Sequence, residues 1–531
     1  MEEKKKAGMT RRQFCGASLI GSICLANMDA IAMAVEKKRE ELEADLVVIG
    51  AGGGGLTAAV SAAEAGVKNI VVLEKTTKPG GNTTNVGVFF AVNSPLQKRL
   101  GINFTSEQAF RDKMAHDHWR QDARLIRKTI EKSGEVLQWL EDKGLEIPQI
   151  KQFAGDDAPQ VGHDGGGFGI LGNAILRILT EDCSKRGIKI LCGTPAKKIL
   201  TDKKGAVTGV LAVGKDKEIK ITAKSVVLAS GGFVHNKELM KKYFPYNIDY
   251  PAGSVPNMTG DGLLMAEEIG AIVDDQLAIL LVGGPGSSTS LNISLDNRFD
   301  TVVVNKDGER YYDESLSLNY NPDDSTNTLT RQRGKEFYVL LDSGIIKDAE
   351  QSNEAPPQGG MPGGTGGSGG MPNGAPGGSG RMPMDEKGSS AGNEKIADTW
   401  EEIAEFIGAD PKVLKETIDR YNSFCEKGCD YDFFKDKKYL RPLNTPPYVA
   451  VRGSHGCQTT FGGIKINHRT EVLNRQDIPI RGLYAVGDCA GSWAPLTYSH
   501  RYPGSASSFA VCSGFIAGES SAKYIRENRM S

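Results

Sequence analysis

A glycine-rich run over residues 50–55 has the G-x-G-x-x-G spacing that brings a backbone close to phosphate groups. It follows a short β-branched stretch, residues 45–49, and precedes an alanine-rich stretch, residues 56–65. A second apolar stretch over residues 69–73 ends at Glu74, whose carboxylate can accept hydrogen bonds from a ribose. This order predicts a strand, a tight turn, a helix, a second strand and an acid, and hence a dinucleotide-binding site.

The glycines of this run suit three separate demands of such a site. Gly50 permits the turn, Gly52 lets the backbone approach a pyrophosphate, and Gly55 lets the helix pack closely on the strand. The N–H groups at the start of the helix would then bind the phosphates.

Two further segments favour FAD over NAD as the dinucleotide. Lys75 leads into a polar glycine loop over residues 79–84, and residues 482–488 form another short apolar run that ends in glycine and Asp488. The dinucleotide domain of NAD-dependent dehydrogenases is usually continuous in sequence. A return segment near the end of the chain is typical of flavoproteins, so we expect FAD.

The composition of the whole chain excludes other classes of function. The 531 residues include 64 Lys+Arg against 66 Asp+Glu, and this balance argues against nucleic acid as the main partner. The sequence has no apolar run of about 18 residues or more, so we expect no membrane-spanning helix. The length is sufficient for two or three domains.

Residues 1–34 have the pattern of an export signal. Basic residues precede an uncharged run over residues 14–28 and an Ala-Met-Ala cleavage site at residues 32–34. The pair Arg11-Arg12 resembles the twin-arginine signal, which exports proteins already folded around a cofactor. We expect export to the periplasm or to the outer face of the cytoplasmic membrane. A disordered or amphipathic N-terminus is the alternative.

The nine cysteines indicate neither a disulfide framework nor a metal site. Cys15 and Cys24 fall within the signal, and the other seven are scattered. Cys425 and Cys429 are four residues apart, with no further Cys or His close by. Since no C-x-x-C-H motif is present, the chain carries no covalent c-type haem. We expect electrons from an external donor such as a cytochrome or an FMN protein.

A series of motifs runs in order from residue 44 to the end of the chain. They are Gly50-x-Gly52-x-x-Gly55, Glu74-Lys75, Gly80-Gly-Asn-Thr83, His163-Asp-Gly-Gly166, Thr194-Pro-Ala196, residues 226–233, Thr259-Gly-Asp-Gly262, residues 304–310, Phe461-Gly-Gly463, Gly487-Asp488 and Arg501-x-x-Gly504. With them the chain resembles the FAD-dependent flavoprotein family of soluble fumarate reductases, succinate dehydrogenase flavoprotein subunits, urocanate reductases and 3-ketosteroid Δ1-dehydrogenases.

This resemblance implies an α/β fold, in which a Rossmann-like FAD-binding domain carries an inserted α+β capping domain. It divides the chain into a first part of the FAD-binding domain (residues 40–266), the cap (residues 267–446) and a second part of the FAD-binding domain (residues 447–531).

Within the cap, residues 352–392 form a Gly/Pro/Met-rich stretch. Such a segment buries too little apolar surface to become ordered, so we expect a flexible surface loop. A Met-rich copper or partner site is the alternative. Beyond it, residues 396–407 and 411–424 predict two helices, the second with Asp410 as its N-cap.

The resemblance also implies which residues bind FAD, and it implies non-covalent binding because no attachment motif of the family is evident. Asp488 stands where the family usually has Glu, and either carboxylate can accept hydrogen bonds from ribityl hydroxyls. The expected cofactor-binding residues are Gly50, Ala51, Gly52, Gly54, Gly55, Glu74, Lys75, Asn82, Thr83, Thr84, Ala196, Asp261, Asp488, Ala506 and Ser507.

Most substrate groups of the fumarate-reducing members have no counterpart in this chain. Leu318 stands where those members have an Arg proton donor, and Thr459 stands where they have a His that clamps a carboxylate. Residues 276–285 lack the H-P-T motif that supplies their second His. Only their C-terminal Arg is retained, as Arg501. We therefore do not expect a dicarboxylate such as fumarate as the substrate.

A flavin that transfers a hydride still needs an acid or a base across the substrate double bond. The loop over residues 498–504 offers His500, Arg501 and Tyr502 as candidate catalytic residues, and Tyr320 lies close to the position of the missing Arg donor. Arg501 would bind a substrate carbonyl or carboxylate. For Tyr320 a role as a surface-loop residue remains open, and Tyr502 could serve for packing alone.

The interpretation that these features favour is an exported FAD-dependent oxidoreductase of anaerobic respiration. It would reduce an activated C=C bond, in an enone or an enoate, by hydride transfer from flavin N5. A 3-ketosteroid-type dehydrogenase and a non-catalytic flavin electron carrier are the alternatives.

Overall fold

The computed structural model of this chain describes residues 38–151, 159–244, 251, 253–275, 277–284, 295, 298–315, 327–351, 393–495, 498 and 501–528. Several expectations fall outside these residues. They concern the export signal (1–34), the Gly/Pro/Met-rich stretch (352–392), Leu318, Tyr320 and His500.

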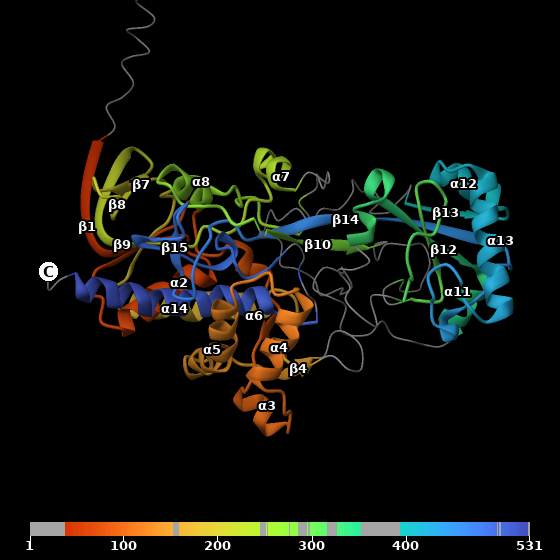
Figure 1. The fold of residues 1–531 in the computed structure, drawn as a ribbon, viewed down its shortest axis with the longest axis horizontal. Coiled ribbons are helices and arrows are strands. Elements are labelled where there is room, and N and C mark those ends of the chain that lie inside the picture. The colour runs from red at the N-terminus through yellow and green to blue at the C-terminus, as the bar shows by residue number, and fades with distance from the viewer. Residues whose placement is uncertain are drawn as a thin grey trace, which may run out of the picture.

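The larger lobe is built on an eight-stranded sheet (Figure 1). Its main path has the order β15-β16-β9-β1-β2-β6, and β9 also pairs with the β8–β7 hairpin. Strand β1 is parallel to both β2 and β9, with Leu46 opposite Ile70 and Ser225. The central segments of these strands, residues 46–49, 70–73 and 226–228, are apolar and buried, as is typical of a parallel sheet that is covered on both faces. The strands are β1 Lys38–Ile49, β2 Ile70–Leu73, β6 Lys189–Leu191, β7 Ala196–Thr201, β8 Val207–Val213, β9 Lys217–Leu228, β15 Glu471–Leu473 and β16 Pro479–Ala485.

Two helices from opposite ends of the chain lie side by side on this sheet, α2 (Gly53–Glu64) and α14 (Ser505–Glu527) (Figure 1). Glycines allow the close approach. A Cβ atom added to Gly514 would lie 2.3 Å from the carbonyl oxygen of Gly54, and one added to Gly518 would lie 2.6 Å from the Cβ of Ser61. The C-terminal helix therefore packs on the same lobe as the glycine-rich run.

Further helices and a small sheet complete the larger lobe. The small sheet has the order β3-β5-β4. Its strands are β3 Val88–Phe90, β4 Gln149–Lys151 and β5 Gly162–Asp164. The helices are η1 Gly81–Asn85, α3 Pro95–Arg99, α4 Ser106–His116, α5 Ala123–Asp142, α6 Ile170–Lys185, α7 Lys237–Tyr243, α8 Asp261–Glu268 and η4 Gly487–Cys489.

The smaller lobe is built on a second, five-stranded sheet with the order β10-β14-β12-β11, to which β13 adds on β14. Its core is a separate apolar cluster that includes Val304, Leu340 and Ile403. Its strands are β10 Ala278–Gly284, β11 Val302–Asn305, β12 Glu336–Asp342, β13 Glu394–Ala397 and β14 Tyr448–Phe461. Its helices are η2 Arg333–Lys335, α11 Ser343–Gln351, α12 Trp400–Ile407, α13 Pro411–Lys427 and η3 Lys437–Tyr439.

One helix expected in this lobe begins later than its sequence pattern indicated. Residues 394–397 form β13, which pairs with Val449 and its neighbours on β14, and α12 begins at Trp400 after its N-cap Thr399. Pairing with the neighbouring strand therefore overrides the apolar spacing over residues 396–407. The second helix, α13, starts as expected, because the side chain of its N-cap Asp410 accepts the backbone N–H of Lys412.

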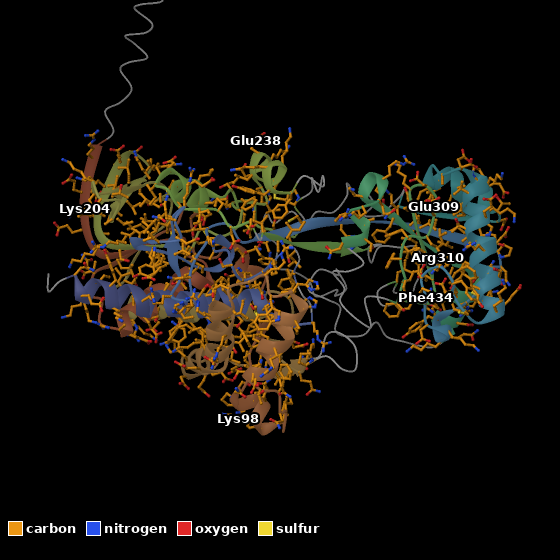
Figure 2. The ribbon with its side chains drawn as sticks, in the orientation of Figure 1. Lys98, Lys204, Glu238, Glu309, Arg310 and Phe434 are labelled. Atoms are coloured by element: carbon orange, nitrogen blue, oxygen red, sulfur yellow. The ribbon has the colours of Figure 1, made fainter. Side chains whose placement is uncertain are left out.

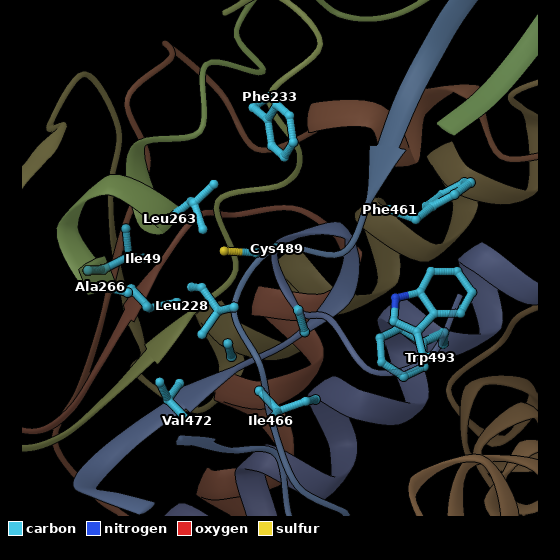
Figure 3. Packing of buried hydrophobic residues seen from close by; sticks show 14 of the residues in the cluster. Ile49, Leu228, Phe233, Leu263, Ala266, Phe461, Ile466, Val472, Cys489 and Trp493 are labelled. Atoms are coloured by element: carbon cyan, nitrogen blue, oxygen red, sulfur yellow. The ribbon is translucent and has the colours of Figure 1, made fainter. Parts of the chain in front are cut away.

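Strand β14 connects the two lobes (Figure 1). Its first half pairs with β12 and β13 in the smaller lobe, and its second half pairs with β10, where Phe461 lies opposite Ala278. At its end Phe461 enters the core of the larger lobe, with ring centroids 5.2 Å from Trp493 (Figure 3). Trp493 in turn stacks on Phe509 of α14 at 4.3 Å. The domain limits drawn from the sequence remain a proposal, with β14 as the segment that both lobes share.

Within the described part of the chain, none of the helices has the length and apolar character that a membrane span requires.

Candidate functional site

The glycine loop has the tight geometry that its spacing predicted. Gly50 has φ = +112°, and a Cβ atom there would lie 2.3 Å from the carbonyl oxygen of Ala229. A Cβ atom at Gly55 would lie 2.0 Å from the carbonyl oxygen of Gly50, so a larger residue would separate helix α2 from β1. Around Gly52 there is more space, since a Cβ atom would meet its nearest neighbours at 3.6 Å. The loop therefore leaves room at the glycine expected to approach the phosphates.

Glu74 lies directly beside this loop at the end of β2. Its Oε2 atom accepts the backbone N–H of Ala51 at 2.9 Å, and its Oε1 atom accepts the N–H and the hydroxyl of Thr76, each at 2.8 Å. A carboxylate has about four acceptor positions. Three of them are filled by these contacts, which fix the side chain, and one is left for a ribose hydroxyl.

The polar glycine loop after β2 lies against the start of helix α2. Thr83 accepts the N–H of Gly53 through its Oγ1 atom at 2.9 Å, and Thr84 donates its hydroxyl to Gly81 at 2.9 Å. Asn82 accepts a longer hydrogen bond of 3.3 Å from Asn85. The N-cap residue of α2 is a glycine and provides no side-chain cap. The positive end of the helix dipole therefore faces this loop, where an anion would be stabilised.

Lys75 and Asp261, both expected to contact FAD, contact each other. The Lys75 Nζ atom donates to the Asp261 carboxylate at 2.9 Å and to the hydroxyl of Thr259 at 2.8 Å. Burial opposes ionisation of Asp261, but the hydrogen bonds from Lys75 and Thr259 outweigh burial and lower its pKa. Ala196 is the buried first residue of β7. These contacts fix the polar groups of α8 relative to the end of β2.

Asp488 lies on the return segment, in η4, and accepts a hydrogen bond of 2.9 Å from the Thr459 hydroxyl on β14. Burial raises the pKa of Asp488 to about 6, and the hydrogen bond from Thr459 opposes this rise. Thr459 is the residue at the position of the carboxylate-clamping His. At this position the chain therefore has a neutral hydroxyl that is bound to an acid, and no cation.

The start of helix α14 is the second helix N-terminus of the site. Gly504, its N-cap, has φ = +78°, and a Cβ atom there would lie 2.6 Å from the carbonyl oxygen of Val88. As a glycine, the N-cap residue provides no side-chain cap. Ser507, in its first turn, donates its hydroxyl to Val88 at 2.6 Å, and Ala506 precedes it. Two helix N-termini with glycine N-caps, the fixed carboxylate of Glu74 and the half-buried carboxylate of Asp488 form a donor and acceptor set that fits a dinucleotide with a pyrophosphate.

Arg501 and Tyr502, just before this helix, share one partner that the sequence did not indicate. The Nε atom of Arg501 donates to Oδ2 of Asp112 at 3.2 Å, and the Tyr502 hydroxyl donates to the same oxygen. Asp112 lies on α4. Tyr502 is fully buried, and both burial and the hydrogen bond to Asp112 raise its pKa. At neutral pH the Tyr502 phenol is therefore protonated.

A small cavity of about 30 Å³ lies behind Tyr502, bounded by Lys113, Trp493 and Ser505. It is large enough for one water molecule. The indole Nε1 atom of Trp493 has no hydrogen-bond partner among the described residues. Lys113 is buried and pairs with Asp117 at 2.8 Å.

A larger cavity, of about 340 Å³, lies elsewhere. It lies in the smaller lobe beside Glu309 and Arg310, which Figure 2 shows there. The Arg310 guanidinium is bound to Glu314 at 2.8 Å and to Asp430 at 2.9 Å. None of the residues expected to bind cofactor or substrate lines this cavity, so we assign it no part in the site.

Comparisons with known proteins agree with this geometry. Residues 45–501 match the model of a family described as "FAD binding domain". The chain is 28% identical to vinyl phenol reductase of Lactiplantibacillus plantarum over 500 residues, which cover 91% of this chain and 97% of that protein. Its fold is similar to the open conformation of a flavocytochrome c3 fumarate reductase, with a TM-score of 0.67, 27% identity and coverage of 98% and 83% of the two chains. It is also similar to a 3-ketosteroid-Δ4-(5α)-dehydrogenase from Rhodococcus jostii, with a TM-score of 0.69 and coverage of 92% and 98%, but at 23% identity this likeness concerns the fold alone.

Proposed function

This chain belongs to the FAD binding domain family and is an FAD-dependent oxidoreductase, and on that premise we propose that it reduces an activated C=C bond in a substrate that is not a dicarboxylate. The residues expected to bind FAD, from the glycine loop to Ser507, are proposed to hold it non-covalently. Bound FAD supplies the hydride chemistry.

The observation that carries the choice of substrate is the contact between Thr459 and Asp488. A dicarboxylate substrate needs cationic groups at both ends, because a buried carboxylate without a partner is strongly disfavoured. The Thr459 hydroxyl is neutral, and its hydrogen bond of 2.9 Å goes to an acid. A second carboxylate at this end of the site would therefore meet Asp488 instead of a cation.

The similarity to vinyl phenol reductase supports the same choice. The name of that enzyme specifies an uncharged alkene conjugated to an aromatic ring. For this chain we propose a conjugated ketone, ester or aryl alkene as the substrate class. The Arg501 guanidinium would donate hydrogen bonds to its oxygen.

Tyr502 is proposed to position the Arg501 guanidinium through their shared partner Asp112, rather than to donate a proton. Its hydroxyl points to Asp112, and its raised pKa makes loss of the proton unfavourable. His500 and Tyr320, the other candidates from the sequence, are the proposed proton donors to the second carbon of the double bond.

Export and the electron donor are further parts of the proposal. The Arg11-Arg12 pair supports export by the twin-arginine route, and the periplasm is the proposed location. The absence of a C-x-x-C-H motif means that no c-type haem is attached to this chain, so a separate cytochrome or FMN protein is proposed to supply the electrons.

The test is anaerobic reoxidation of the dithionite-reduced holoprotein. Each compound of a panel is mixed with it, and the return of the oxidised flavin absorbance is recorded. We expect reoxidation by neutral conjugated alkenes and little by fumarate. Reduction of the oxidised protein by a saturated 3-ketosteroid would indicate a dehydrogenase instead, and no response to any compound would indicate an electron carrier.

A further inference from the structure

The carboxylate of Asp112, on helix α4, contacts the loop before α14. Its Oδ2 atom accepts hydrogen bonds from both the Arg501 guanidinium, at 3.2 Å, and the Tyr502 hydroxyl. The Asp112 side chain is 39% exposed and the Arg501 side chain 22% exposed, so both are partly shielded from water. In such a place, a charge pair interacts more strongly than at a fully exposed surface.

A second cation among the described residues near this point is compensated as well. Lys113, whose Nζ atom lies 5.9 Å from the centre of the Tyr502 ring, is bound to Asp117 at 2.8 Å. Arg501 is therefore paired with Asp112, and Lys113 is paired with Asp117. Among the described residues around Tyr502, hydrogen-bond donors are thus present without the excess positive charge that a carboxylate substrate needs.

We propose that Asp112 is a specificity-determining residue, which cancels the charge of Arg501 and so selects uncharged substrates over carboxylates. A carboxylate placed on the Arg501 guanidinium would be repelled by Asp112, whereas a carbonyl or ester oxygen would still accept the guanidinium hydrogen bond. Asp112 acts through Arg501 and Tyr502, and it is a positioning residue in the reaction. This inference rests on the proposed function for its substrate class.

The test uses two ligands of almost the same shape that differ by one charge, cinnamate and its methyl ester. Each is titrated into the oxidised holoprotein, and binding is followed by the change in flavin absorbance. We expect the wild-type protein to bind the ester more tightly. In Asp112→Asn the affinity for cinnamate relative to the ester should rise at least about tenfold, because one negative charge a few ångströms from the carboxylate is removed.

Two further variants make the result specific. Glu107→Gln removes a carboxylate from the same helix, but its side chain is 72% exposed and pairs with Arg111, so we expect no change in the ratio of affinities. In the double variant Asp112→Asn with Arg501→Gln, the gain for cinnamate should disappear, because the guanidinium that attracts it is gone. If Asp112→Asn does not bind FAD, Asp112→Ser removes the same charge and takes its place.

An affinity ratio is not changed by a general loosening of the site, since both ligands would be affected equally. An unchanged ratio in both neutral variants, a gain that persists without Arg501, or the absence of ester binding to every variant would overturn the inference. Binding is measured without turnover. A protein that shifts its preference as expected but reduces no alkene would contradict the proposed reaction and leave the assignment of Asp112 in place.

Discussion

Thr459 on β14 donates its hydroxyl to Asp488 on the return segment at 2.9 Å. This contact joins the strand that both lobes share to the segment that closes the dinucleotide site. It places a neutral group and an acid where the fumarate-reducing relatives are expected to have a cation.

The first prediction concerns this pair. Because burial raises the pKa of Asp488 to about 6, the folded protein takes up a proton more readily than the unfolded chain. The contribution of this group therefore increases the free energy of unfolding as the pH falls through about 6 towards 4. In Thr459→Val the hydrogen bond that opposes the rise is lost, and the increase should begin at a higher pH. Denaturant unfolding of the flavin-free protein at a series of pH values measures this.

Asp488→Asn is the matched control for that experiment. It removes the titrating group but keeps the size of the side chain, so the increase attributed to Asp488 should vanish. Identical pH profiles in the wild type and both variants would show that Asp488 does not titrate in this range.

The second prediction is that Glu74→Ala releases FAD. The carboxylate holds the glycine loop through Ala51 and has one acceptor position left for a ribose. A hydrogen bond to a charged group contributes about 1.5–3 kcal/mol, so FAD affinity should fall at least about tenfold. Flavin absorbance after gel filtration measures retention. Glu131→Ala, on the exposed face of α5, should retain FAD like the wild type, and full retention by Glu74→Ala would contradict the assignment.

The third prediction concerns the buried charges of the smaller lobe. Arg310 binds Glu314 and Asp430, and Lys435 lies 3.3 Å from Glu314. Removing one partner of a buried pair costs about 3–5 kcal/mol, so Arg310→Met should destabilise this lobe by about that amount in urea unfolding. Arg420→Met is the control, because Arg420 lines the same cavity but is exposed, and it should change little.

The same network predicts sensitivity to acid. Burial opposes ionisation of both Glu314 and Asp430, but the neighbouring cations outweigh burial and lower both pKa values. A group with a lowered pKa stabilises the folded state above its usual pKa, and this stabilisation is lost as the pH falls towards the folded-state pKa. We expect the smaller lobe of the wild type to lose stability in acid. In Arg310→Met this loss should be smaller, and an equal loss would contradict the role of the network.

The fourth prediction tests export. In a bacterium with the twin-arginine system, Arg11→Lys with Arg12→Lys should leave the uncleaved precursor in the cytoplasm, because that route requires the arginine pair. Fractionation and immunoblotting measure the distribution. Normal processing of the variant would exclude this route.

The parts of the site that the sequence predicted are those with a local pattern. The glycine loop, β2 and Glu74 lie within about 25 consecutive residues, so the spacing of these residues predicts their arrangement. Thr459 and Asp488 could each be identified as site residues from their positions in the motifs that the chain shares with the family. Their hydrogen bond could not, since it depends on how β14 meets the return segment.

The sequence around Asp112 does not predict its contact with Arg501. Asp112 is 389 residues from Arg501 in the chain and occupies an ordinary position on α4, so only the folded arrangement shows the contact. The formation of strand β13 also depends on a distant segment, because its four residues form a strand by pairing with β14. The partner of Asp112 and the strand conformation of β13 are both determined by contacts between segments that are distant in the chain. No local sequence pattern predicts such contacts.

The central claim is that this oxidoreductase reduces a conjugated alkene without a dicarboxylate clamp. The most direct measurement is stopped-flow reoxidation of one preparation of the reduced holoprotein by methyl cinnamate and by fumarate. With Thr459 bound to Asp488 and Arg501 bound to Asp112, we predict a rate constant for the ester at least about 100-fold above that for fumarate, the range by which one transition-state hydrogen bond alters a rate. A faster reaction with fumarate would contradict the account.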